Sequence, residues 1–292
     1  MKRSTRVFGL LAYLLLGVSL RFAAAATPPE WTRPFPPFRI AGNLYYVGSE
    51  DLAAYLITTT QGNILINSNL ASSPAQISKS VEALGFKFRD VKILLISHGH
   101  YDHTAGSAEI KKLTGAKFEV MDGDVSVVES GGRNDFQFSN DKTLWFPPAH
   151  VNRTLHDGDV VSLGGTVLTA HKTAGHTKGT TTWTMDEKEA GKTLHVVILG
   201  SPNVLDSYKL VGNKTYPQIA DDFRRQFATL KDLPCDVFLG AHGSSFDLTG
   251  KYDRWKRGDQ AAFVDPTGYR SYVEERERAF DTALKRQQAS GK

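Results

Sequence analysis

Short apolar runs separated by turn residues predict strands in both halves of the chain. Residues 91–96 form the clearest run, VKILLI, which is typical of a fully buried strand. The expected strands of the first half are residues 44–48, 53–59, 63–67, 91–96 and 117–121, and those of the second half are residues 159–163, 166–173, 180–185, 194–200 and 235–240.

Apolar residues at helical spacing predict helices after each group of strands. The expected helices are residues 73–84, 104–115, 122–130, 216–230 and 268–286. Strands followed by helices, twice over, predict an α/β fold in which two sheets pack together with helices outside. Residues 130–150 have little periodicity but several aromatic side chains, which favours a functional flap over a disordered segment.

The first 26 residues predict a secretory signal peptide. They combine a basic start, the apolar run VFGLLAYLLLGVSL and small residues that end at Ala26. A retained membrane anchor is the alternative, but the apolar run is shorter than the ~20 residues needed to span a bilayer. We therefore expect cleavage near Ala26, a periplasmic protein, and a single catalytic domain over residues 27–292. Its proline-rich lead should run over the surface.

Charge argues against a nucleic-acid or membrane partner. The chain has 35 Lys and Arg against 31 Asp and Glu, but four of the basic residues lie in the predicted signal peptide. The mature chain is thus formally neutral, and we expect a monomer without stable membrane association. The single cysteine, Cys235, excludes an internal disulfide. It lies in an apolar run, which favours a buried structural thiol over a metal ligand or nucleophile.

Histidines concentrate where predicted strands end. His98 and His100 follow the strand over residues 91–96 at positions i and i+2, so both can face one ion. Asp102 and His103 follow on the turn, where they can face a second ion. His176 and His242 come after later strands, each beside small residues that let the backbone turn closely.

These six side chains predict two zinc sites, because imidazole with one carboxylate suits zinc better than magnesium or calcium. His98, His100 and His176 are assigned to one ion, and Asp102, His103 and His242 to the other. Taken alone, a histidine at a strand end is more often a hydrogen-bonded structural residue. The remaining histidines are interpreted as surface residues or as neighbours of the ligands: His150, His156, His171 and His195.

The HGHYDH segment, with the later GHT and AHG, resembles the metallo-β-lactamase superfamily, whose signature is His-x-His-x-Asp-His. The resemblance implies an αβ/βα sandwich with a dinuclear zinc site at one edge. Thioesterases, lactonases and phosphodiesterases of the superfamily place a bridging Asp after the strand over residues 194–200, and subclass B1 enzymes place a Cys nearby. This chain has Ser201 there, and it is similar to subclass B3 from about Trp31 to Tyr272.

The resemblance implies zinc-dependent hydrolysis of the β-lactam amide by a metal-bound hydroxide, with antibiotic resistance as the outcome. Asp102 would be both a ligand and the carboxylate that orients the hydroxide. Ser201 and Asn203 would bind the substrate carboxylate, and Phe138 and Leu144 would form an apolar wall. Turn formation remains an alternative role for Ser201, as does core packing for Phe138 and Leu144.

Two other functions stay open. One is hydrolysis of a thioester or lactone on the same scaffold. The other is a non-catalytic protein in which zinc has a purely structural role. Six intact ligands argue against this second function, because structural zinc prefers closed four-coordinate sites.

Overall fold

The computed structural model describes residues 27–291. The predicted signal peptide, residues 1–26, lies outside this range, so cleavage near Ala26 and a periplasmic location stay predictions. Within residues 27–291, no helix is both long enough and apolar enough to cross a bilayer.

Two mixed sheets form the centre of the fold, one from each half of the chain. The first has seven strands in the order β1-β2-β3-β4-β5-β6-β7, and the second has five in the order β12-β11-β10-β9-β8. The strands of the first sheet are β1 (Phe38–Ala41), β2 (Leu44–Tyr46), β3 (Tyr55–Thr59), β4 (Gly62–Ile66), β5 (Val91–Leu95), β6 (Lys117–Met121) and β7 (Arg153–Leu155). Those of the second are β8 (Val160–Leu163), β9 (Thr166–Lys172), β10 (Thr181–Glu189), β11 (Lys192–Leu199) and β12 (Val237–Gly240).

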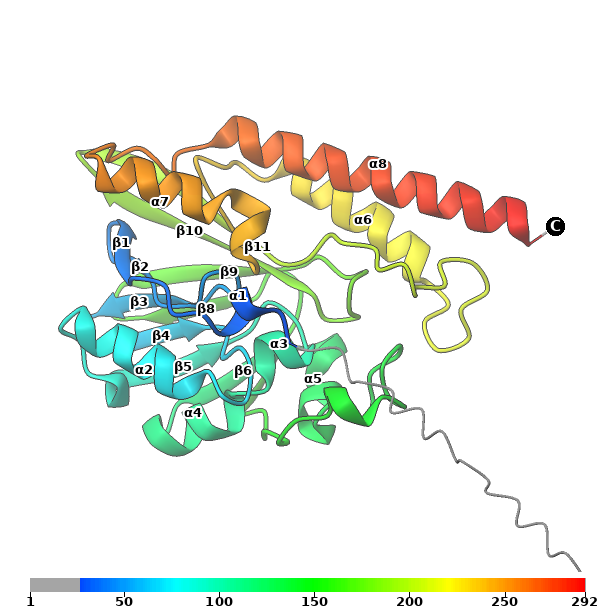
Figure 1. Ribbon diagram of the computed structural model, residues 1–292, viewed down its shortest axis with the longest axis horizontal. Helices are drawn as coiled ribbons and strands as arrows, with labels where there is room; N and C mark the ends of the chain where they lie inside the picture. The colour runs from blue at the N-terminus through cyan, green and yellow to red at the C-terminus, as the bar shows by residue number, and fades with distance from the viewer. Residues whose placement is uncertain (1–26, 292) are drawn as a thin grey trace, which may run out of the picture.

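Helices cover the outer face of each sheet (Figure 1). The first half contributes α1 (Pro29–Thr32), α2 (Pro74–Ala83), α3 (Tyr101–Thr104), α4 (Ser107–Thr114) and α5 (Asp122–Ser130), with short 3-10 turns η1 (Phe88–Asp90) and η2 (Lys142–Leu144). The second half contributes α6 (Ile219–Asp232), α7 (Leu248–Lys256), α8 (Pro266–Ser290) and the turn η3 (Gly243–Phe246). In Figure 1, α2, α4 and α5 lie below the sheets, and α6, α7 and α8 lie above them. The αβ/βα sandwich is therefore confirmed.

Successive side chains along a strand point to opposite faces of the sheet, which explains how the first sheet packs on both faces. In β3, Tyr55 and Ile57 join the core between the sheets, whereas Leu56 joins the core beneath α2 and α4. In β4, Ile66 packs in the core between the sheets and Leu65 packs in the core beneath α2 and α4. A sheet that is buried on both faces holds the loops at its edge in place.

Several sequence predictions need correction. The helix expected over residues 104–115 is α4, which begins only at Ser107, because Ala105 and Gly106 separate it from the short unpredicted helix α3. The N–H of Gly106 donates to the carbonyl of Asn69, and a Cβ at position 106 would lie 2.5 Å from the carbonyl oxygen of Ser68. Close approach of the β4–α2 loop therefore sets this break, and no periodicity in the sequence could report it.

Other differences concern short or polar elements. The proline-rich lead contains the short helix α1, which was not predicted, but none of residues 27–37 is buried, so the lead runs over the surface as expected. The strand β7 and the helix α7 were not predicted, because β7 has three residues and α7 has few apolar ones. Cys235 is only partly buried and packs against the core between the sheets. Burial raises the pKa of its thiol to about 12, which agrees with an unreactive structural role.

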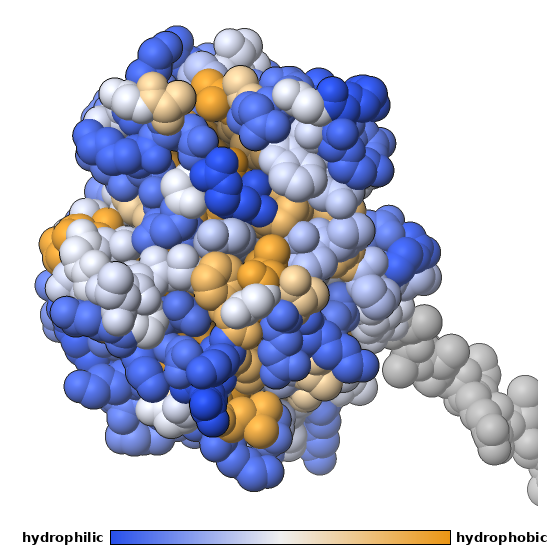
Figure 2. All heavy atoms as spheres, turned by 90° about the vertical axis from the view of Figure 1, so that its left-hand side faces the viewer, coloured by the Kyte–Doolittle hydropathy of each residue, from blue (hydrophilic) through white to orange (hydrophobic). Residues whose placement is uncertain are grey.

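The end of the molecule that carries the tips of β1, β2 and β3 is mostly hydrophilic, with apolar residues gathered in small patches (Figure 2). The large apolar side chains that the described residues expose lie on separate elements: Leu113, Val160, Val167, Val211 and Val264. Such scattered residues are normal on a protein surface.

Candidate metal centre

The first three predicted zinc ligands meet where β5 and β9 end. His98 and His100 follow β5, and His176 lies in the loop between β9 and β10. Their ligand atoms all lie within 4.8 Å of one another, and the three side chains are buried. We call these residues the three-histidine cluster. Each ring thus comes from a loop held by a buried sheet, as the sequence predicted.

Polar groups on the far side of these rings, two at hydrogen-bond distance and one carboxylate farther away, indicate which nitrogen faces the cluster. Nδ1 of His176 donates to the carbonyl oxygen of Asn203 (2.8 Å), which leaves Nε2 with a lone pair. Nε2 of His100 faces Oδ2 of Asp135 at 3.6 Å, so Nδ1 is the atom that turns inward. Nδ1 of His98 lies 3.2 Å from the hydroxyl of Ser97. Such outer partners orient metal-binding imidazoles in known metal sites.

Asp102, His103 and His242 form a second group, which we call the aspartate cluster. Oδ2 of Asp102 lies 3.2 Å from Nε2 of His103 and 3.5 Å from Nε2 of His242. The two imidazole nitrogens are themselves 3.1 Å apart. The ligand atoms of His98, Asp102 and His103 also lie within 4.8 Å of one another, so the two clusters adjoin.

Burial keeps the three-histidine cluster neutral. It lowers the pKa of His98, of His100 to about 4 and of His176 to about 3, and neighbouring imidazoles add to the effect. Neutral rings at pH 7 have the lone pair that a metal ion needs. In His242 burial also lowers the pKa, but Asp102 and Asp51 outweigh it and raise the pKa to about 9. The imidazole of His242 therefore lies where the two carboxylates favour a positive charge.

Three further carboxylates around the clusters were not predicted from the sequence. Oδ2 of Asp51 lies 2.8 Å from Nδ1 of His242, Asp135 faces His100, and Asp124 accepts a hydrogen bond from the N–H of Gly99. All three lie in polar segments that read as ordinary turns or helix starts, so no local signal singles them out. Only contacts between distant parts of the chain place them here.

Charge supports the fit of divalent cations to this site. Four carboxylates, those of Asp51, Asp102, Asp124 and Asp135, surround five histidines. Of the described residues that line the adjoining cavity, none is a lysine or arginine. Buried carboxylates without a compensating charge are costly, and nitrogen and carboxylate donors of this kind suit zinc. The residues present therefore fit metal ions.

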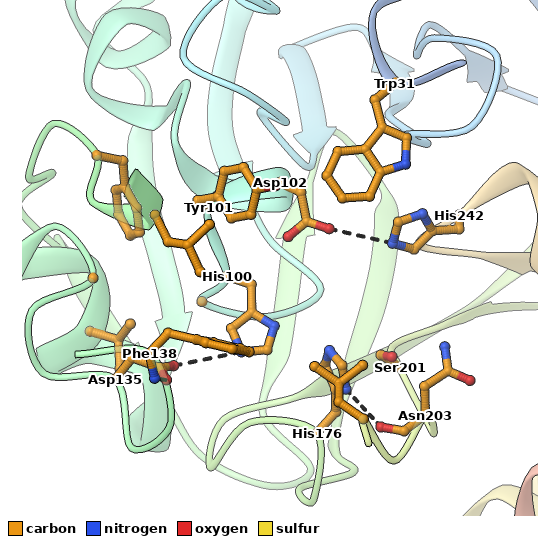
Figure 3. Close-up of a pocket in the computed structure, with 16 residues that line it drawn as sticks. Trp31, His100, Tyr101, Asp102, Asp135, Phe138, His176, Ser201, Asn203 and His242 are labelled. Atoms are coloured by element: carbon orange, nitrogen blue, oxygen red, sulfur yellow. Dashed lines mark hydrogen bonds and ion pairs between the residues drawn. The ribbon is translucent and has the colours of Figure 1, made fainter. Parts of the chain in front are cut away.

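A cavity of about 330 Å³ opens beside the clusters. Figure 3 shows His100, Asp102, His176 and His242 pointing toward the same space, with Phe138 beside His100. The ring of Phe138 lies 5.4 Å from that of His100, and Leu144 also lines the cavity. Trp31 and Tyr101, which were not predicted, line it as well. Residues 130–150 thus supply much of one apolar wall.

The loop after β11 forms another part of the cavity, with Ser201 and Asn203 among its lining residues. A guanidinium nitrogen of Arg276 in α8 donates to Oδ1 of Asn203 (3.5 Å). The amide nitrogen of Asn203 is then the atom left to donate into the cavity. None of the histidines that were not predicted to be ligands lines this cavity: His150, His156, His171 and His195.

The sandwich fold and this donor set together define a metal-dependent hydrolase. The family model described as the metallo-beta-lactamase superfamily matches residues 52–189. The native FEZ-1 metallo-beta-lactamase from Legionella gormanii is 55% identical, with a TM-score of 0.87, over 88% of this chain and 98% of that one. The chain belongs to the metallo-β-lactamase superfamily.

Two other solved structures are also similar. BJP-1, a subclass B3 metallo-beta-lactamase of Bradyrhizobium japonicum, is 37% identical, with a TM-score of 0.84, over 90% of this chain and 99% of that one. LRA-12, a class B3 di-zinc enzyme from an Alaskan soil metagenome, is 39% identical, with a TM-score of 0.84, over 89% of this chain and 98% of that one. The predicted resemblance to subclass B3 is thus confirmed.

Curated relatives match over shorter segments. A UPF0173 metal-dependent hydrolase from Anaeromyxobacter dehalogenans is 28% identical over 150 residues, 49% of this chain and 51% of that protein. A second, from Pyrococcus abyssi, is 35% identical over 69 residues, 24% of this chain and 28% of that protein. This chain therefore spans about half or less of the curated relatives that it matches.

Proposed function

We propose that this chain is a zinc-dependent β-lactamase that opens the amide bond of penicillins, cephalosporins and carbapenems. One observation carries the proposal: two adjoining donor clusters lie beside a single cavity that has an apolar wall and polar groups opposite. A volume of about 330 Å³ lies in the range of small-molecule sites. Likeness to FEZ-1 and BJP-1, both called metallo-beta-lactamases, supports this assignment.

The six predicted ligands would hold two zinc ions: His98, His100 and His176 one of them, and Asp102, His103 and His242 the other. Zinc bound by such donors lowers the pKa of water toward neutrality and polarises a carbonyl group. Oδ2 of Asp102 contacts both histidines of its cluster, which leaves Oδ1 to accept a hydrogen bond from the attacking water or hydroxide and so orient it. No side-chain nucleophile is required.

The loop after β11 would select for an anionic substrate. The Ser201 hydroxyl and the Asn203 amide are donors at the cavity, and both can hydrogen-bond the carboxylate that β-lactams carry. Phe138 and Leu144 would pack on apolar substituents and exclude water from that side. Substrate binding would thus use a polar side and an apolar side of one cavity.

A thioester or lactone hydrolase is the main competing function. Members of the superfamily with those activities resemble one another in a metal-bridging Asp after the strand that corresponds to β11. This chain has Gly200, Ser201, Pro202 and Asn203 there. Because these four positions carry no carboxylate, β-lactam hydrolysis is favoured over hydrolysis of a thioester or lactone.

The test is a comparison of substrates with purified residues 27–292. Imipenem and nitrocefin are assayed beside a homoserine lactone and a glutathione thioester, each with and without added zinc. We expect zinc-dependent hydrolysis of the two β-lactams, inhibition by EDTA, and no inhibition by clavulanate. Faster turnover of the lactone or thioester, or β-lactam hydrolysis that survives complete metal removal, would overturn the proposal.

A further inference from the structure

The carboxylate of Asp124 connects the two loops that carry the three-histidine cluster. Asp124 lies in the first turn of α5 and is 1% exposed. Its Oδ2 accepts hydrogen bonds from the N–H of Gly99 and from the hydroxyl of Thr177, both at 2.7 Å, and its Oδ1 accepts one from the N–H of Gly179 at 3.0 Å. One side chain thereby joins the loop after β5 to the loop between β9 and β10.

Both loops pack directly against this carboxylate. A Cβ at Gly99 would lie 3.2 Å from Cγ of Asp124, and a Cβ at Gly179 would lie 2.7 Å from the same atom. A Cβ at Gly123 would collide with the carbonyl of Lys178. Glycine at these positions therefore allows the two loops to approach α5 closely enough for all three hydrogen bonds to form.

The groups that Asp124 holds lie next to the ligands in the chain. Gly99 separates His98 from His100, and Thr177 follows His176. Asp124 hydrogen-bonds none of these histidines, so its effect on them passes through the backbone. The aspartate cluster has a different support, since His242 hydrogen-bonds Asp51.

We propose that Asp124 is a positioning residue that sets the separation of these two loops and thereby the metal affinity of the three-histidine cluster, with little influence on the aspartate cluster. The inference rests on the proposed function, because it assigns an ion to His98, His100 and His176. A carboxylate is required: an amide would present an N–H to at least one of three donors.

The test measures zinc affinity of each cluster separately, by competition with a chromophoric chelator. The His242→Ala variant retains the three-histidine cluster, and the His176→Ala variant retains the aspartate cluster. We expect Asp124→Ala to weaken zinc binding about 10–100-fold in the His242→Ala background, the usual effect of removing a group that orients a ligand. In the His176→Ala background it should change affinity less than about 3-fold.

Further variants distinguish a specific effect on zinc affinity from a general loss of the folded structure. Asp124→Asn keeps the volume of the side chain and should weaken the same cluster. Thr177→Ala, which removes one of the three hydrogen bonds, should give a smaller loss that Thr177→Ser reverses. Glu187→Gln is the matched control, because Glu187 is another buried carboxyl group that lies outside the cavity lining, and it should leave both zinc affinities unchanged.

Two results would overturn the positioning role: unchanged zinc affinity in Asp124→Ala, or equal weakening of both clusters. Failure of the proposed function gives a different result, since the unsubstituted chain would then bind no zinc or would not hydrolyse a β-lactam. A chain that hydrolyses β-lactams with Asp124 replaced and its zinc retained would refute only the role of Asp124.

Discussion

Oδ2 of Asp51 lies 2.8 Å from Nδ1 of His242, although 191 positions separate the two residues in the chain. The other carboxylate oxygen of Asp51 accepts from the N–H of Ser244, so both ends of the His242 turn are tied to the first half of the protein. This contact orients the ring of His242 and turns Nε2 toward Asp102.

Replacement of Asp51 by Ala should weaken zinc binding at the aspartate cluster about 10–100-fold, because the His242 ring loses the partner that orients it. Chelator competition in the His176→Ala background measures this loss. Glu50→Ala is the control, since Glu50 pairs with Arg33 at the surface. Equal zinc affinities for the Asp51 and Glu50 variants would contradict the expectation.

His98→Ala and His242→Ala should each lower the zinc content and reduce imipenem hydrolysis by at least about 100-fold, as removal of a metal ligand does. His195→Ala should match the unsubstituted chain, because His195 pairs with Asp186 away from the cavity. Metal analysis and circular dichroism of all three variants accompany the assay. Undiminished hydrolysis by His98→Ala would exclude its role as a ligand.

Arg276→Met should release the amide of Asn203 and raise KM for a cephalosporin about 2–10-fold, the effect of one hydrogen bond, with kcat little changed. The methyl ester of the same cephalosporin lacks the negative charge and should show no such change. Arg278→Met, an exposed neighbour on α8, is the control. An equal effect on acid and ester would show that Arg276 acts on something other than carboxylate binding.

Removal of metal should lower Tm, because a protonated His242 then supplies a single positive charge against the carboxylates of Asp51, Asp102, Asp124 and Asp135. Calorimetry before and after EDTA treatment, with readdition of zinc, measures the shift. A Tm that is the same with and without zinc would mean that no ion is bound at these residues.

Stability should also depend on pH through Glu187. Burial raises the pKa of Glu187 from 4.5 to about 7, and its Oε1 has no hydrogen-bond partner among residues 27–291. The folded state therefore holds this proton more tightly than the unfolded state, so the stabilisation is complete below pH 4.5 and is lost as the pH rises through about 7.

The Glu187→Gln variant should not lose stability in this way as the pH rises. Relative to the unsubstituted chain, it should gain free energy of unfolding on the order of 1 kcal/mol between pH 5 and pH 8 after allowance for solvent screening. Urea unfolding at the two pH values measures the difference. Parallel pH profiles for the two proteins would refute it.

The convergence of the six predicted ligands could be predicted from the sequence because their signal is local. His98 and His100 directly follow a buried strand, and His176 and His242 lie beside small residues after other strands, so topology alone brings them to one sheet edge. The two-sheet sandwich could be predicted for a similar reason, since apolar runs mark strands wherever a sheet is buried on both faces.

The groups that support the ligands could not be found in this way. Asp51, Asp124 and Asp135 are carboxylates in polar segments, and their partners are distant in sequence or belong to the backbone. The break between α3 and α4 has the same origin, because contact with the β4–α2 loop determines it. The local pattern of apolar and polar residues predicts which face of a helix or strand is buried. It does not predict which distant segment of the chain contacts that face.

Both clusters draw their side chains from the two halves of the sandwich. His98 and His100 lie beside His176, and Asp102 and His103 lie beside His242. An ion at either position is a cross-link between residues more than seventy apart in the chain, in a protein whose one cysteine precludes an internal disulfide. If the proposed ions bind there, metal loading and the association of the two halves are coupled, and loss of zinc would loosen the contact between the halves as well as remove the proposed activity.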